Sequence, residues 1–154
     1  MRSLRSVVVA VALFSFPSSG QADTVTPDVA RPRVEHHVRV AERIADHFES
    51  VIADTCPSFS APSGWDAYVE VETEQLVLLM AHLEQAWQEA KRTGDDEVRR
   101  AAKAPRVQRD HLRQLVGKLR GCAQANGASF SPSAVWRRVE REVPVRQADI
   151  ALPR

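Results

Sequence analysis

The sequence predicts an all-α fold: an up-down helical bundle of three main helices plus a shorter C-terminal helix, closed by one disulfide. Residues that favour helices (Ala, Leu, Glu, Arg and Gln) are plentiful, whereas glycine accounts for 6 of the 154 residues. Apolar residues recur at steps of three and four along several long segments, which is the period of one helix face. The chain has 2 cysteines, an even number that suits a single cross-link.

Residues 1–22 have the three parts of a cleavable secretory signal peptide. Two arginines precede an apolar run over residues 7–16, and Gly20 and Ala22 supply the small residues that a signal peptidase reads. The apolar run is about half of the ~20 residues needed to span a bilayer. We therefore expect export, to the periplasm or out of the cell, with no transmembrane span in the mature chain.

The remaining chain has the length of one domain. Residues 23–33 contain two prolines and no helical periodicity, which predicts a flexible leader. Residues 34–154 are predicted to form a single helical-bundle domain.

The first helix is predicted over residues 34–54, where the apolar residues form one stripe. The second is predicted from about residue 65 to residue 93. Ser63 and Asp66 have the spacing of a capping box at its start, and Gly94 suits its C-terminal end.

The third helix is predicted to begin at Asp95 or Asp96, either of which can cap it. Pro105 should kink or break this helix, because proline lacks the N–H that a helix interior needs. The apolar pattern then resumes and stops at Asn126 and Gly127.

A shorter fourth helix is predicted after Ser131, which can cap it, with Pro132 in the first helical position. Pro144 is expected to end it. The last ten residues are then expected to pack as an extended or single-turn tail.

Cys56 and Cys122 are predicted to form a disulfide, because an even cysteine count in an exported chain is typical of one. Short connections favour antiparallel neighbours, so the first and third helices should end at the same end of the bundle. Each cysteine lies near one of these ends, so the topology agrees with the pairing. The spacing fits neither a zinc nor a haem attachment motif.

Histidines are the candidate metal or haem ligands. Positions along the helices place His47 and His111 in one layer, and His82 with His36 or His37 in another. Two histidines at one level could bind a metal or the iron of a non-covalent haem. No histidine pair has the i, i+4 spacing on one helix, so the sequence predicts no cofactor and treats a haem or metal site as an alternative.

Charge is divided between two helices. The second helix carries acidic residues and no Lys or Arg between residues 65 and 90, whereas the third is strongly basic. The two helices should attract each other as antiparallel neighbours. The surplus basic face could also bind a protein partner or an anionic surface. Export, and the lack of aromatic residues within the basic run, argue against nucleic acid. The candidate partner-binding residues are Arg99, Arg106, Arg109, Arg113 and Trp136.

These observations favour a non-enzymatic protein-interaction or accessory module in the periplasm. The alternative is a small-ligand, haem or metal carrier that uses the histidines. A small all-helical secreted enzyme is the second alternative, although the chain has no nucleophile-elbow, phosphate-loop or other catalytic motif.

Overall fold

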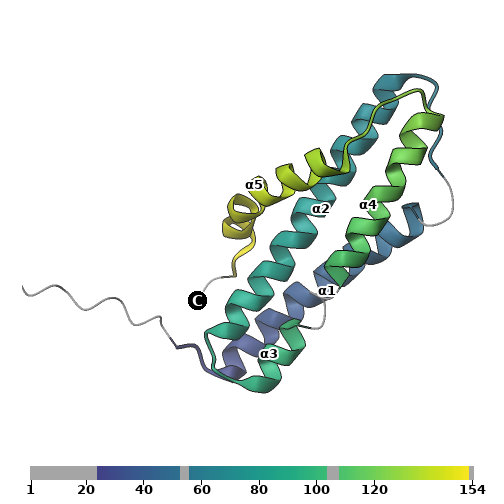
Figure 1. Cartoon of the computed structure of the whole chain (residues 1–154). Coiled ribbons are helices and arrows are strands. Elements are labelled where there is room, and N and C mark those ends of the chain that lie inside the picture. The colour runs from purple at the N-terminus through teal and green to yellow at the C-terminus, as the bar shows by residue number, and fades with distance from the viewer. Residues whose placement is uncertain (1–23, 53–55, 104–107, 153–154) are drawn as a thin grey trace, which may run out of the picture.

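The predicted all-α fold is confirmed (Figure 1). A computed structural model describes residues 24–52, 56–103 and 108–152, and in these ranges it contains helices and no strands. The helices are α1 (Pro27–Ile52), α2 (Pro62–Lys91), α3 (Asp96–Lys103), α4 (Gln108–Ala125) and α5 (Pro132–Ile150).

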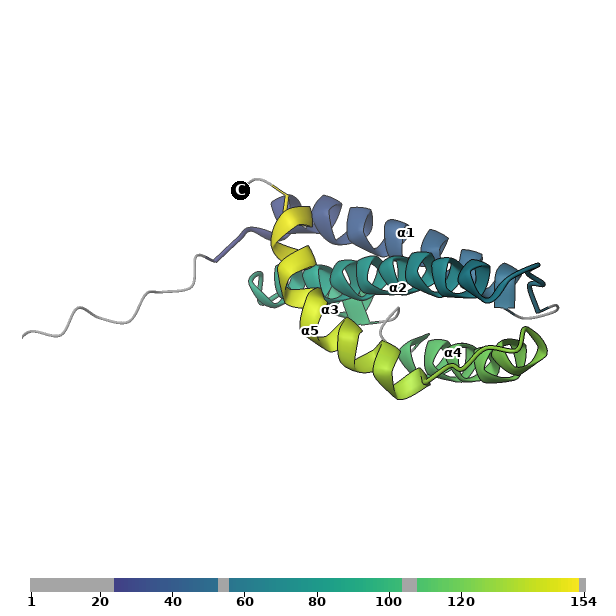
Figure 2. The same ribbon diagram turned by 90° about the horizontal axis from the view of Figure 1, so that it is seen from above.

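The two long helices α1 and α2 lie side by side and form the centre of the molecule (Figures 1 and 2). The short helix α3 packs against both of them at one end of the pair. The helix α4 packs on α1 towards the other end, and α5 crosses α2 obliquely. The predicted third helix is therefore present as two helices, α3 and α4.

The predicted flexible leader over residues 23–33 is wrong from Pro27 onwards, because α1 begins there and not at residue 34. Pro27 takes the first helical position, which needs no N–H donor. The carbonyl oxygen of Thr26 accepts the N–H of Ala30 at 3.1 Å. Ala30 is fully buried, and it extends the apolar stripe one turn before Val34. Packing of that extra turn holds it in the helix.

The start of α2 also differs from the prediction. Ala61 is the N-cap and makes no side-chain capping bond, and Pro62 takes the first helical position, so the capping box of Ser63 and Asp66 is wrong. Beyond the end of α2, Gly94 has a φ of 70°, a left-handed conformation that glycine adopts readily. It lies where the sequence placed the helix end.

The third predicted helix is broken as expected. Asp95 caps α3, since its Oδ1 accepts the N–H groups of Glu97 and Val98, each at 2.9 Å. The helix ends at Lys103 and α4 begins at Gln108. Pro105 lies outside the described residues. The predicted stop after α4 is confirmed, because α4 ends at Ala125 and Gly127 follows with a φ of 65°.

The prediction that Pro144 ends the last helix is wrong. Ser131 caps α5 as predicted, but the helix continues through Pro144 to Ile150. Two contacts beyond the proline hold this last segment on α2. Arg146 donates to Glu74 at 3.1 Å, and Gln147 donates to Gln85 at 3.0 Å.

The buried side chains form two clusters. The larger one lies between α1, α2 and α4 and includes Val139 from α5. The smaller one, called here the α3 seat, joins α3 to the start of α1 and the end of α2. It consists of Val34, Ala86, Ala90, Val98 and Ala102. Its small side chains let the three helices approach closely.

The predicted disulfide between Cys56 and Cys122 is confirmed, with Cα atoms 5.1 Å apart. Asn126 fixes the loop beside it. Its side chain accepts the N–H of Phe59 and donates to the carbonyl oxygens of Pro57 and Cys122. The ends of α1 and α4 are thus joined both covalently and by hydrogen bonds.

Charge holds α5 on α2. Arg138 pairs with Glu70 and Glu74 on α2 and with Glu142 on its own helix. Arg146 forms a second bond to Glu74. The acids of the second helix were expected to meet the third helix, but these two carboxylates meet α5.

Reduction of the disulfide should lower the free energy of unfolding. The two cysteines are 66 residues apart in sequence, and closing a loop of that size stabilises by about 4 kcal/mol on the chain-entropy model. We expect the melting temperature to fall by roughly 10–20 °C in reducing agent, measured by circular dichroism. The Cys56→Ser/Cys122→Ser variant should melt at the lower temperature with or without reductant. An unchanged melting temperature would contradict the disulfide.

Replacement of the central arginine on α5 should also destabilise the fold. Arg138→Met keeps the length of the side chain but removes the ion pairs to Glu70, Glu74 and Glu142. Because the Arg138 side chain is 25% exposed, we expect a loss of about 1–2 kcal/mol in urea unfolding, smaller in high salt. The control is Arg137→Met, at an exposed neighbour on α5. Equal effects of the two substitutions would rule out this role.

Candidate functional site

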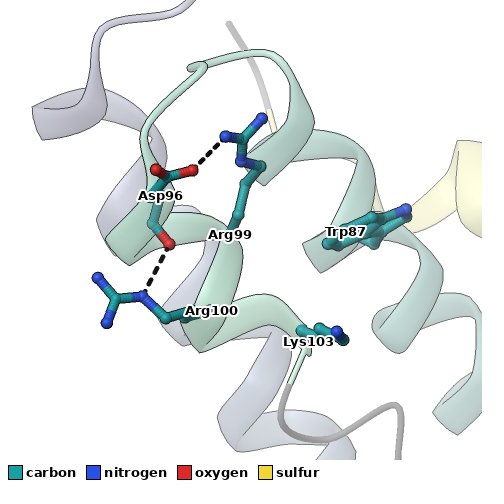
Figure 3. A pocket seen from close by; sticks show the side chains of 5 residues that line it. All are labelled: Trp87, Asp96, Arg99, Arg100 and Lys103. Atoms are coloured by element: carbon teal, nitrogen blue, oxygen red, sulfur yellow. Dashed lines mark hydrogen bonds and ion pairs between the residues drawn. The ribbon is translucent and has the colours of Figure 1, made fainter.

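A surface hollow between α2 and α3 gathers three of the cations of the basic run (Figure 3). It has a volume of about 390 Å³ and is called here the basic hollow. Its lining residues are Trp87, Asp96, Arg99, Arg100 and Lys103.

The register of α3 explains why the four lining residues of this helix all face away from the core. Residues at i, i+3, i+4 and i+7 lie on the same side of a helix, and the four lining residues of α3 have this spacing. Val98 and Ala102 occupy the other side and pack in the α3 seat. Burial of the apolar side therefore turns the charged side outwards.

The single carboxylate of Asp96 does not neutralise the three cations of the basic hollow. Arg99 forms an ion pair with the Asp96 carboxylate, whose pKa this arginine lowers through a hydrogen bond and its charge. The Nε of Arg100 donates to the backbone oxygen of Asp96 at 3.3 Å. Within the part of the chain that the structure describes, neither Arg100 nor Lys103 has a carboxylate partner. The hollow therefore has a net positive charge.

Trp87 supplies the aromatic wall of the basic hollow from α2. In the view of Figure 3, Arg99 lies between Asp96 and the indole, Lys103 lies below the indole at the end of α3, and the Arg100 guanidinium points away from the indole. The ammonium of Lys91 is 5.7 Å from the centre of the indole ring. A flat apolar wall beside several cations can hold an anionic group together with an apolar or aromatic side chain.

The predicted partner-binding residues do not form one surface. Arg99 lines the basic hollow, whereas the Arg113 guanidinium lies 5.2 Å from the ring centre of Trp136 on α5. Arg109 is half-buried, and its Nε is buried without a hydrogen-bond partner. Arg106 lies outside the described residues. Thus the structure divides the basic run at the break between α3 and α4.

The sequence-based set missed four of the residues that line the basic hollow: Trp87, Asp96, Arg100 and Lys103. Arg100 and Lys103 belong to the basic run, and their spacing from Asp96 and Arg99 could have selected them. Trp87 falls within the apolar pattern of the predicted second helix. Nothing in the sequence distinguishes a tryptophan in the core from one that lines a surface hollow at its edge.

The histidines behave differently in the two predicted layers. The Nδ1 atoms of His37 and His82 are 2.9 Å apart, which confirms that this pair shares a layer. His36 lies beside them, with its ring centre 5.2 Å from that of His37. The other two each meet a glutamate. His47 is 3.1 Å from Glu72, and His111 is 3.4 Å from Glu49.

Burial keeps the paired rings neutral. His37 is fully buried and His82 is 6% exposed. Loss of hydration lowers the pKa of both rings to about 4, and the neighbouring His36 adds to this effect. Among the described residues, no group of three His, Cys, Asp or Glu side chains could hold a metal ion. The pair alone offers two ligands.

The chain matches no protein-family model, and neither the curated proteins nor the solved structures include a significant match. Over the described residues, no helix has the length and apolar character needed to cross a bilayer. The predicted signal peptide lies outside the described residues.

Acid should destabilise the fold through the His37–His82 pair. Both folded-state pKa values are near 4, below the ordinary value of 6.5, so the unfolded chain binds more protons between these values. The contribution of the neutral pair to the free energy of unfolding is fully present above pH 6.5, and it falls as the pH drops towards 4. We expect a loss on the order of 2 kcal/mol per ring between pH 7.5 and 5, measured by urea unfolding.

Two double variants distinguish the acid effect of the His37–His82 pair from that of the other histidines. His37→Asn/His82→Asn should flatten the pH dependence over this range, because the amides do not titrate. His47→Asn/His111→Asn should retain it, since these side chains are 44% and 52% exposed. An equally steep fall in the first variant would assign the acid effect to other groups.

Proposed function

We propose that this protein is an exported, non-enzymatic accessory module of the periplasm that binds an acidic segment of a partner protein in the basic hollow. One observation carries the proposal. Arg100 and Lys103 lie without a carboxylate partner among the described residues, at a hollow walled by Trp87. Cations that form no ion pair beside a half-buried aromatic side chain favour an anionic ligand.

The shape and charge of the basic hollow favour a peptide over a lipid surface. Its volume of about 390 Å³ suits one or two side chains. The carboxylates of Asp96 and Glu97 project from the same short helix, with side chains 79% and 68% exposed. A uniformly anionic membrane would repel both. An extended segment can place its acidic side chains against the cations and avoid these two positions.

Binding of a defined acidic peptide tests the proposal. The probe is a fluorescein-labelled 12-residue peptide of Asp and Glu with one central Phe, followed by fluorescence anisotropy. We expect saturable binding that weakens as salt is raised, because exposed charges are screened. Arg100→Glu/Lys103→Glu should weaken binding by about tenfold or more, since it reverses two charges at the hollow.

The matched control reverses two exposed cations of α4 in the same basic run, Lys118→Glu/Arg120→Glu. It changes the net charge equally but leaves the basic hollow intact. Retained peptide affinity in this control supports the hollow as the site. Equal loss in both variants, or binding to anionic vesicles without binding to the peptide, would contradict the proposal.

One observation supports a second candidate function, a metal carrier. His37 and His82 bring two ring nitrogens to 2.9 Å of each other, and imidazole binds zinc and copper. The pair lacks a third ligand among the described residues, so we rank this function second. Metal analysis of the purified protein tests it, and a stoichiometric metal would favour it. We find no arrangement of the described residues that supports the enzyme alternative.

A further inference from the structure

The buried His37–His82 pair joins the two central helices and lies apart from the basic hollow. At an Nδ1–Nδ1 distance of 2.9 Å, one ring donates its N–H and the other accepts it. The Nε2 of His37 is also buried, and it has no hydrogen-bond partner. With His37 as the donor, its Nε2 carries no proton, and a proton added there would create a buried N–H without an acceptor. The pair is therefore arranged for two neutral rings.

The charged groups on α1 oppose the addition of a proton to either ring of the pair. His36 and Arg43 are the α1 groups whose charges act on the paired rings, and both are basic. The carboxylates of Glu42 and Asp46 line a separate outer hollow of α1 with His36 and Arg43. Neither carboxylate is among the groups that act on His37 or His82.

None of the described residues on the other helices offers the pair a compensating carboxylate, since none is among the groups whose charges act on the two rings. On α2, Glu89 follows His82 by two turns and is already close to Arg33 and Arg92. From α3, the residues turned inwards are apolar. From α5, the neutral Gln147 reaches α2. From α4, His111 lies against Glu49 near the far end of α1. A cation on the pair is therefore buried without a counter-charge.

The pair lies next to the α3 seat. Val34 precedes His37 by one turn of α1, and Ala86 follows His82 by one turn of α2. With 8 residues, α3 is too short to remain helical alone, so it depends on packing against α1 and α2. Separation of the two long helices at the histidines would remove both supports of α3.

The opposite end of the bundle is held differently. Along α1, His37 is about 22 Å from Ile52, taking the helical rise per residue. Beyond Ile52 the disulfide joins the loop after α1 to α4, and Asn126 ties the same loop. Neither link depends on a histidine. One end is thus closed covalently, and the other is closed by packing around a titratable pair together with the ion pairs Arg31–Glu97 and Arg33–Glu89.

We propose that the His37–His82 pair is an acid-sensitive joint: protonation opens the α1–α2–α3 end of the bundle, reversibly, while the disulfide end stays closed. Burial keeps both rings neutral at neutral pH, and the low pKa of about 4 for each ring agrees with this geometry. Opening would release α3 and change the basic hollow, so acid would alter what the protein presents there. The joint does not depend on the proposed function, because its test measures structure and not binding.

Backbone amide NMR of the disulfide-bonded protein, titrated from pH 7.5 to 4.5 and back, tests the joint. We expect loss of the native resonances of α3 and of the facing turns of α1 and α2, at residues 30–37 and 82–90. Resonances around Asn126 and the disulfide should persist. Return to pH 7.5 should restore the spectrum. Loss of all resonances together, or an unchanged α3, would overturn the proposal.

His37→Asn/His82→Asn assigns the transition to the pair. Asparagine places a polar atom near the position of Nδ1, so the two amides can keep a hydrogen bond across the helices without titrating. This variant should show no α3 transition in the same range, whereas the control His47→Asn/His111→Asn should show it. A transition in both variants would place the acid sensitivity elsewhere.

Should the double asparagine variant fail to fold at pH 7.5, the imidazole resonances of the wild-type protein give an independent test. The rings of His37 and His82 must titrate together with the loss of the α3 amides. Titration of the α3 amides with His36 or with carboxylates would overturn the proposal. The same would follow from a bound metal at the pair, shown by metal analysis, since a metal would replace the shared proton.

Discussion

The packing of α1 against α2 is the contact on which the rest of the structure depends. The helix α3 rests on both of them, α4 packs on α1, and α5 is fixed on α2. The disulfide extends this arrangement, because it joins the loop after α1 to α4 at the end remote from α3. The positions of α3, α4 and α5 therefore follow from the spacing and register of the central pair.

Polar side chains between α1 and α2 restrict their packing to one register. Burying a polar group costs free energy unless it finds a partner, and the partners here come from opposite helices. His37 meets His82, and Arg33 from α1 approaches the buried carboxylate of Glu89. A slip of one helix against the other would leave these groups without partners. The same groups that fix the register also make it sensitive to protonation.

The basic hollow is a consequence of how α3 is held. A helix of 8 residues with two buried apolar side chains must turn its remaining residues outwards. Charge then accumulates on the outer side, and Trp87 from α2 completes the wall. On α4, beyond the break, the guanidinium of Arg113 packs over the indole of Trp136. The break between α3 and α4 thus separates the basic hollow from Arg113, which packs on α5.

The sequence by itself determined the helical class, the cap at Ser131, a cap at Asp95 or Asp96, the break in the third helix and the disulfide. These depend on local spacing and on the order of the helices. Distance along a helix also placed His82 in one layer with His36 or His37, and the structure pairs it with His37. It could not decide rotation about the helix axis, so His47 and His111, predicted in a common layer, each meet a glutamate instead. Only the tertiary structure decided that α1 starts at Pro27 and that α5 continues past Pro144. Contacts such as Ala30 in the core and Arg146 with Glu74 join residues far apart in sequence, and they outweigh the local preference of proline.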